Sequence, residues 1–188
     1  MIWIRTTLLI SVLIFTSCDI GEVPTASLNN SLDAESAAQE GIDTPALVFF
    51  PDNISTGLGG SVAFELFVME VEHLTGASIK LKYDPAKLEM SSVNVGTFFT
   101  GANAPIFLFE NDVDNGILHI NTFYLGPDSL SVSGTGDLAM VVFNTKLPGQ
   151  TVLEYLPESE LADPDDNPIE IKGFGEGQVL DWAWGTRL

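Results

Sequence analysis

Two acidic loops carry the side chains best suited to metal chemistry. The first gathers four oxygen-bearing side chains within residues 163–167: Asp163, Asp165, Asp166 and Asn167. The second, residues 112–116, offers two aspartates and an asparagine before a glycine. Calcium takes six to eight oxygen ligands, so either loop would need backbone carbonyls or remote carboxylates as well. Asp, Asn, Pro and Gly also form turns for local reasons. The sequence therefore leaves two readings open, a calcium site, best placed at 163–167, or a pair of turns.

Catalytic chemistry has no recognisable pattern here. Glycosidases need two placed carboxylates, but with 26 acidic residues pairs arise by chance, and no motif selects one. The sequence holds no Gly-x-Ser-x-Gly elbow, no His-Glu-x-x-His and no phosphate-binding loop. The two histidines, His73 and His119, stand in no triad context. We expect a protein that is not an enzyme and that needs no cofactor, calcium apart.

The single cysteine, Cys18, follows an apparent export signal. Arg5 gives a short positive segment, and residues 8–15 form an apolar run that is shorter than the roughly 20 residues of a membrane-spanning helix. Phe15-Thr16-Ser17-Cys18 resembles a bacterial lipobox, in which the cysteine is lipidated and becomes the mature N-terminus. We predict a signal peptide over 1–17 and an extracellular bacterial lipoprotein held to a membrane only through Cys18. Ordinary signal cleavage is the alternative.

Composition excludes several kinds of partner. The 188-residue chain has 7 basic and 26 acidic residues, for a formal net charge of −19. Nucleic-acid binding is excluded because phosphate neutralisation needs Lys and Arg on one face, and electrostatic docking to anionic lipid is equally disfavoured. The acidity favours a basic partner surface, or serves solubility alone.

The chain divides into a linker, one domain and a short tail. Residues 18–45 carry six acids and no base, so they are predicted as a disordered linker, in which a short helix near 32–39 would be marginal alone. Residues 46–181 form the domain and 182–188 the tail. Turn signals recur about every ten residues without a long 3.6-residue period, which predicts an all-β sandwich or barrel.

The clearest strand signal lies within residues 74–83. Ser78, Lys80 and Lys82 alternate with apolar residues, which indicates a strand with one buried face. Pro85 ends that strand because it lacks a donor and restricts the residue before it. A tight turn at Glu72-His73 is expected before it.

Two further strand predictions complete the sheet pattern. Residues 61–71 form a strand that points Val62, Phe64, Leu66 and Val68 inward. Phe67 and Met69 lie on its outer side, where a loop or the end of the chain is expected to cover them; a contact surface is the alternative. Residues 106–110 and 117–124 form a hairpin, since Asn115-Gly116 supplies a turn with positive φ.

Five short signatures, in order, resemble the cohesin domain, the β-sandwich module that binds dockerins in bacterial polysaccharide-degrading assemblies. They are Gly59-Gly60-Ser61-Val62, Tyr83-Asp84-Pro85, Leu88-Glu89, residues 133–139 (SGTGDLA) and Gly177-Gln178-Val179. The resemblance spans nearly all of 46–180. It implies a single β-sandwich of about nine strands with jelly-roll topology, shared with cellulose-binding modules.

Cohesins bind dockerins through a flat sheet face, whose strands correspond to residues 74–83, 106–110 and 117–124. Matching the sequence to that face, and extending it by strand alternation, gives seven partner-binding residues: Gly76, Ser78, Lys80, Lys82, His119, Asn121 and Tyr124. The family often has Asn and Asp where this chain has Gly76 and Ser78. The resemblance implies a non-catalytic module that tethers a protein bearing a helical, calcium-loaded dockerin to the cell surface.

Two other functions remain open. A carbohydrate-binding module shares the fold and presents exposed aromatics, here Trp182 and Trp184 with Phe123 and Tyr124, to a polysaccharide. Two tryptophans at the end of a chain more often form a packing clasp, here over Phe67 and Met69. A structural or adhesin lipoprotein without a dockerin partner is the third candidate.

Overall fold

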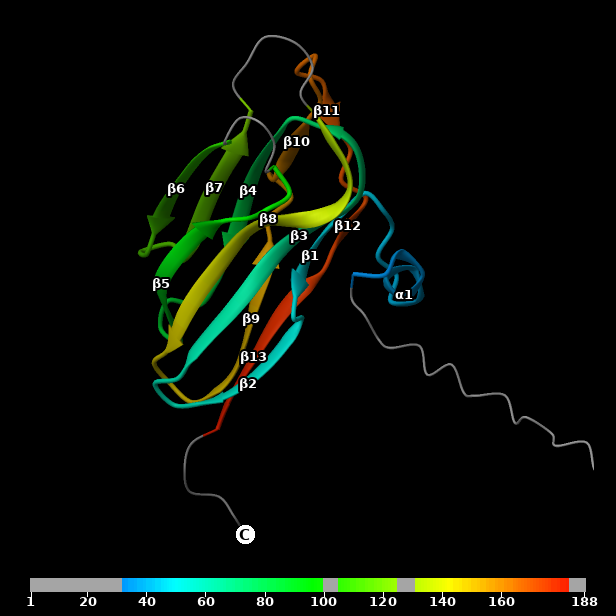
Figure 1. Ribbon diagram of the computed structural model, residues 1–188. Helices are drawn as coiled ribbons and strands as arrows, with labels where there is room; N and C mark the ends of the chain where they lie inside the picture. The colour runs from blue at the N-terminus through cyan, green and yellow to red at the C-terminus, as the bar shows by residue number, and fades with distance from the viewer. Residues whose placement is uncertain (1–31, 100–104, 125–130, 183–188) are drawn as a thin grey trace, which may run out of the picture.

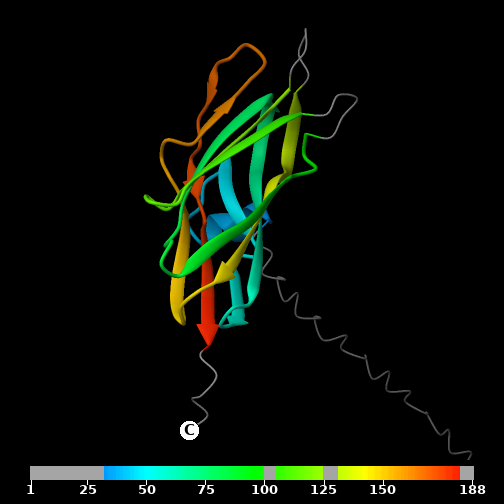
Figure 2. The ribbon, with the colours of Figure 1, turned by 90° about the vertical axis from the view of Figure 1, so that its left-hand side faces the viewer.

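The computed structural model is a β-sandwich of two facing sheets (Figures 1 and 2). It describes residues 32–99, 105–124 and 131–182. That part of the chain holds helix α1 (Ala34–Gln39) and thirteen strands. The strands are β1 (Ala46–Phe50), β2 (Asn53–Gly57), β3 (Ser61–Leu74), β4 (Gly76–Lys82), β5 (Leu88–Val95), β6 (Ile106–Asp112), β7 (Ile117–Phe123), β8 (Val132–Thr145), β9 (Gly149–Tyr155), β10 (Glu160–Ala162), β11 (Pro168–Ile169), β12 (Gly173–Phe174) and β13 (Glu176–Trp182).

The two sheets are mixed. Sheet A has the order β12-β1-β3-β8-β5, and sheet B contains β11-β10-β4-β9-β13-β2, with β7 paired to β4 and β6 paired to β7. The pairs are antiparallel except β1 with β12 and β13 with β2. The predicted β-sandwich is confirmed, with thirteen strands instead of about nine. The additional strands are short: β2, β10, β11 and β12 have between two and five residues each.

The core lies between the sheets where alternation placed it. The inward residues of β3, Val62, Phe64, Leu66 and Val68, are at most 2% exposed, and Ala77, Ile79 and Leu81 of β4 are buried with them. Tyr155 of β9 packs its ring 4.4 Å from that of Phe49 in β1. Its hydroxyl donates to the Val48 carbonyl oxygen at 2.8 Å, which ties sheet B to sheet A through a buried hydrogen bond.

Helix α1 covers one end of the outer face of sheet A. Asp33 caps it by accepting from the Ser36 N–H. Ala37 is 2% exposed and clusters with Ala46, Val48 and Met69. Met69 and Phe67 are thus covered as expected, but by this helix, which precedes the sandwich. The packed chain therefore begins within the segment 18–45 that was predicted as a linker, while Cys18 and Trp184 lie outside the described residues.

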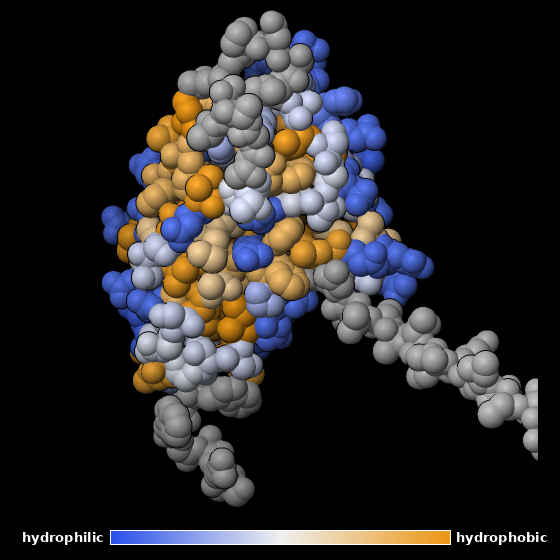
Figure 3. Space-filling model, in the orientation of Figure 1, coloured by the Kyte–Doolittle hydropathy of each residue, from blue (hydrophilic) through white to orange (hydrophobic). Residues whose placement is uncertain are grey.

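The rest of that outer face stays apolar. Phe50, Ala63, Met140 and Val142 point outward from β1, β3 and β8, and apolar side chains gather over these strands in Figure 3. Among the described residues no helix is long and apolar enough to cross a membrane.

The connection from β3 to β4 differs from the prediction. The tight turn at Glu72-His73 is wrong, because β3 continues to Leu74 with register shifts against β8. Glu70 and His73 take positive φ, 49° and 54°. Such bulges bend a strand and increase its twist, and here they carry the chain from sheet A to sheet B.

Candidate partner-binding face

One outer surface of sheet B gathers most of the predicted partner-binding residues. The register sets Ser78 opposite Asn121 and Lys80 opposite His119. Directly opposed residues share a face, so six of the seven predicted residues lie on one surface: Gly76, Ser78, Lys80, Lys82, His119 and Asn121. We call the outer surface of β4, β7 and β6 the docking face. Its register is fixed because the intervening residues, such as Ile79 and Ile120, are fully buried.

The hairpin that completes this face closes on a local hydrogen-bonded turn. The Asp112 carboxylate accepts from the Asn115 backbone N–H at 3.1 Å and from its side-chain amide at 2.7 Å. These bonds to Asn115 hold the pKa of Asp112 below its usual value. Gly116 follows with a φ of 61°, the left-handed region that glycine tolerates. The second acidic loop is therefore accounted for as a turn.

Hydrogen bonds also order side chains on the docking face. Ser78 Oγ lies 2.9 Å from His119 Nε2, with the donor set by the tautomer of the imidazole. The Lys82 ammonium donates to the Asn115 carbonyl oxygen. The backbone N–H of Lys80 donates to Ser159 Oγ at 3.0 Å. The β6–β7 hairpin and the segment before β10 thus hold the outer side of β4 in place from its two edges.

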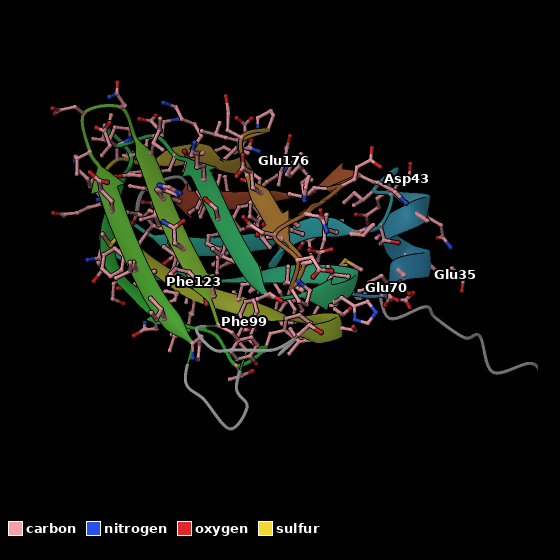
Figure 4. All side chains as sticks on the ribbon, turned by 90° about the horizontal axis from the view of Figure 1, so that it is seen from above. Glu35, Asp43, Glu70, Phe99, Phe123 and Glu176 are labelled. Carbon is pink, nitrogen blue, oxygen red and sulfur yellow. The ribbon has the colours of Figure 1, made fainter. Side chains whose placement is uncertain are left out.

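The seventh predicted residue, Tyr124, is half-buried at the edge of this surface, and its phenol turns toward Phe99. Its hydroxyl donates to the Phe99 carbonyl oxygen at 2.6 Å, and its ring meets that of Phe99 edge-on at 5.2 Å. Burial raises the pKa of the Tyr124 phenol. Phe123 takes the outward position instead, opposite Gly76 and Ile106, and Figure 4 labels Phe99 and Phe123. Tyr124 directly follows the end of β7 at Phe123.

Sequence reasoning left several residues of this surface unnamed. Leu108 lies opposite Asn121 and is 58% exposed, and Glu110 lies opposite His119. Glu160 of β10 lies opposite Ser78 on the other side of β4. Counting pairs back from the Asn115-Gly116 turn would have found Leu108 and Glu110, whereas Glu160 depends on a pairing between distant segments.

The loop proposed for calcium forms a second turn. The Asp163 carboxylate accepts from the backbone N–H groups of Asp165 and Asn167 at 2.9 and 2.8 Å, and from the Asn167 side-chain amide. The Asn167 hydrogen bonds are the main reason that the pKa of Asp163 lies below its usual value. Asp166 takes a positive φ of 62° to close the loop between β10 and β11. In the described parts of the chain no three His, Cys, Asp or Glu side chains gather as metal ligands.

Comparison with known proteins gives one family. The cohesin domain model matches residues 50–172, and no curated protein sequence matches the chain. The fold is similar to that of the sixth cohesin from the scaffoldin B of Acetivibrio cellulolyticus, solved with a Cel5 dockerin mutant, at a TM-score of 0.61 and 21% identity over 73% of this chain and 98% of that one.

Two more solved structures have the same fold. The cohesin-dockerin complex Coh-OlpA-Doc918 from Clostridium thermocellum gives a TM-score of 0.61 at 15% identity, covering 73% of this chain and 98% of that chain. A non-cellulosomal cohesin from the archaeon Archaeoglobus fulgidus gives 0.58 at 18% identity, covering 72% and 90%. At such low sequence identities these structures show the fold alone, and membership of the family rests on the family model. Because that model matches well over half of the sequence, the chain belongs to the cohesin family.

Proposed function

We propose that this protein is a non-catalytic binding module that holds a dockerin domain on its docking face. The observation that carries the proposal is the single surface formed by Gly76, Ser78, Lys80, Lys82, His119 and Asn121. These positions were matched to the family's binding strands, and β6 extends the surface beside them. Solved relatives include cohesins in complex with dockerins.

The chemistry of the docking face suits a protein partner. Leu108 is 58% exposed beside Asn121, so the face offers apolar contact area next to hydrogen-bonding groups. Ser78 and Asn121 offer donors and acceptors at the centre. A sheet surface of this kind accommodates a helix laid across its strands, which fits the helical dockerin of the family.

Charge gives the docking face a distinct character. The chain has 7 basic residues against 26 acidic ones, yet Lys80 and Lys82 both project from β4 beside His119. Local positive charge on a strongly negative protein orients an approaching partner more than it adds affinity. We therefore propose that acidic side chains of the partner approach this part of the face.

We further propose that a lipid on Cys18 anchors the domain at the cell surface. Helix α1 packs on sheet A, on the far side of the molecule from β6 and β7 (Figures 1 and 4). The chain that leads back toward Cys18 therefore joins the domain away from the docking face. An anchor attached there would leave that face open to a dockerin-bearing enzyme or scaffold.

A pull-down tests the proposal. The purified protein is incubated with the source organism's secreted proteins in calcium, then in chelator, and the retained proteins are identified. We expect dockerin-bearing proteins to be retained in calcium. They should be lost in chelator, and lost by the variants Ser78→Arg and Asn121→Arg. Ala63→Arg, exposed on the outer face of sheet A, is the matched control and should retain them. Retention on insoluble polysaccharide alone, without any dockerin, would replace the proposal with sugar binding.

A further inference from the structure

A groove of about 580 Å³ hollows the docking face where β4 meets β10. Gly76 forms its floor, with Phe123 opposite on one side and Ala162 opposite on the other. Neither Gly76 nor Ala162 fills the space between the Phe123 ring and the β10–β11 turn with Pro164. A Cβ on Gly76 would lie 3.2 Å from the Phe123 Cβ. A side chain at position 76 would therefore occupy the floor of the groove and press on Phe123.

The lining of the groove favours a positively charged occupant, because its charged side chains are carboxylates. The charged residues that line the groove are all acidic: Glu160, Asp163 and Asp166. The phenol of Tyr124 is the other ionisable group in the lining. Ser78 and Asn121 add hydrogen-bonding groups at the end nearest Glu160. His73 acts on the Asp163 carboxylate from nearby, and Lys80 lies beyond Ser78 on the same strand face. Neither of these bases lines the groove.

We propose that the groove receives a basic side chain of the bound dockerin, and that arginine fits it better than lysine. The inference rests on the proposed function and adds the chemistry of one contact. The aliphatic stem of an arginine would pack between Phe123 and Pro164, with its planar guanidinium against the aromatic ring. The same group can donate two parallel hydrogen bonds to a carboxylate such as Glu160. A short or acidic side chain would leave the hollow part-filled or would meet like charge.

The first test needs no dockerin. N-acetyl-arginine amide and its neutral counterpart, N-acetyl-citrulline amide, are titrated into the isotope-labelled protein and followed by NMR. The arginine probe should shift the backbone amides of Gly76, Ser78 and Glu160 several-fold more than the citrulline probe, and the difference should shrink as salt screens the charges. It should vanish in Gly76→Leu, which fills the floor. Equal shifts from the two probes, or shifts only outside the groove, would overturn the inference.

The second test uses a dockerin retained in the pull-down. Glu160→Gln removes one charged hydrogen-bond acceptor and should weaken binding by about tenfold. Glu89→Gln is the control, since Glu89 is an exposed acid on β5 of sheet A. If the wild-type protein and Glu160→Gln bind the dockerin with equal affinity, the inferred arginine contact in the groove is refuted, while dockerin binding to the face stands. If no dockerin binds at all, the proposed function fails, and the arginine titration still decides what the groove accepts.

Discussion

Asp181 is the residue whose replacement should stabilise the protein most clearly. It lies in β13 opposite Thr56 and Gly149 and is 4% exposed. Within the described residues both of its carboxylate oxygens are buried without a hydrogen-bond partner. A buried polar group that loses its water without gaining a partner costs free energy on folding. Its neighbour on the same face, Val179, is fully buried, so an apolar side chain suits the position.

We therefore expect Asp181→Val to raise the free energy of unfolding by about 1–3 kcal/mol, the usual cost of an unsatisfied buried group. Valine also suits a strand. For a domain of this size each kcal/mol raises Tm by about 2–4 °C. Urea denaturation would show the midpoint moving to higher concentration at an unchanged slope.

Asp181→Asn serves as the control that removes the charge and keeps the shape. It should stabilise less than Asp181→Val, because an amide still has polar atoms to satisfy. A loss of stability in both variants would refute the reasoning. It would mean that the carboxylate binds a cation or a group from outside the described residues.

Three further predictions concern the helix, an acidic turn and the link between the sheets. Ala37→Asp should lower the free energy of unfolding by about 1–3 kcal/mol and expose α1 to hydrogen exchange, because it sets a charge against Met69. Ala38→Asp, on the exposed side of the helix, should do neither. Equal effects of the two variants would contradict the packing of α1 on sheet A. Hydrogen bonds hold the pKa of Asp163 below its ordinary value of 3.8 in the folded protein, so its stabilisation is present above that value and is lost as pH falls from about 5 through the lowered pKa. Asp163→Asn should flatten that part of a stability–pH curve, and an unchanged acid limb would speak against the turn. Tyr155→Phe should cost about 1 kcal/mol in urea denaturation by removing the buried bond to the Val48 carbonyl; an unchanged midpoint would show that the bond contributes nothing.

Much of the sandwich follows from local pattern. The alternation in β4 identified its buried face, and the Asn115-Gly116 turn fixed the pairing of β6 with β7. Alternation also placed Lys80, Lys82, His119 and Asn121 on one exposed face, which the register between β4 and β7 bears out. These features were predictable because each depends on neighbouring residues or on one short turn.

Other features depend on pairs of segments far apart in the chain. Strand β2 pairs with β13, where Ile54 lies opposite Val179, and Ala37 is buried because it packs with Ala46, Val48 and Met69. The groove requires Ala162 to arrive beside Gly76. None of these contacts leaves a signal in the local sequence.

A hydrogen-exchange footprint of a calcium-loaded dockerin on this protein tests most directly whether the docking face binds it. We predict slower exchange in β6, β7 and β4, over Ile106–Asp112, Ile117–Phe123 and Gly76–Lys82, with β3 and β8 of sheet A unchanged. Protection over the apolar outer face of sheet A, with the docking face unchanged, would contradict the account.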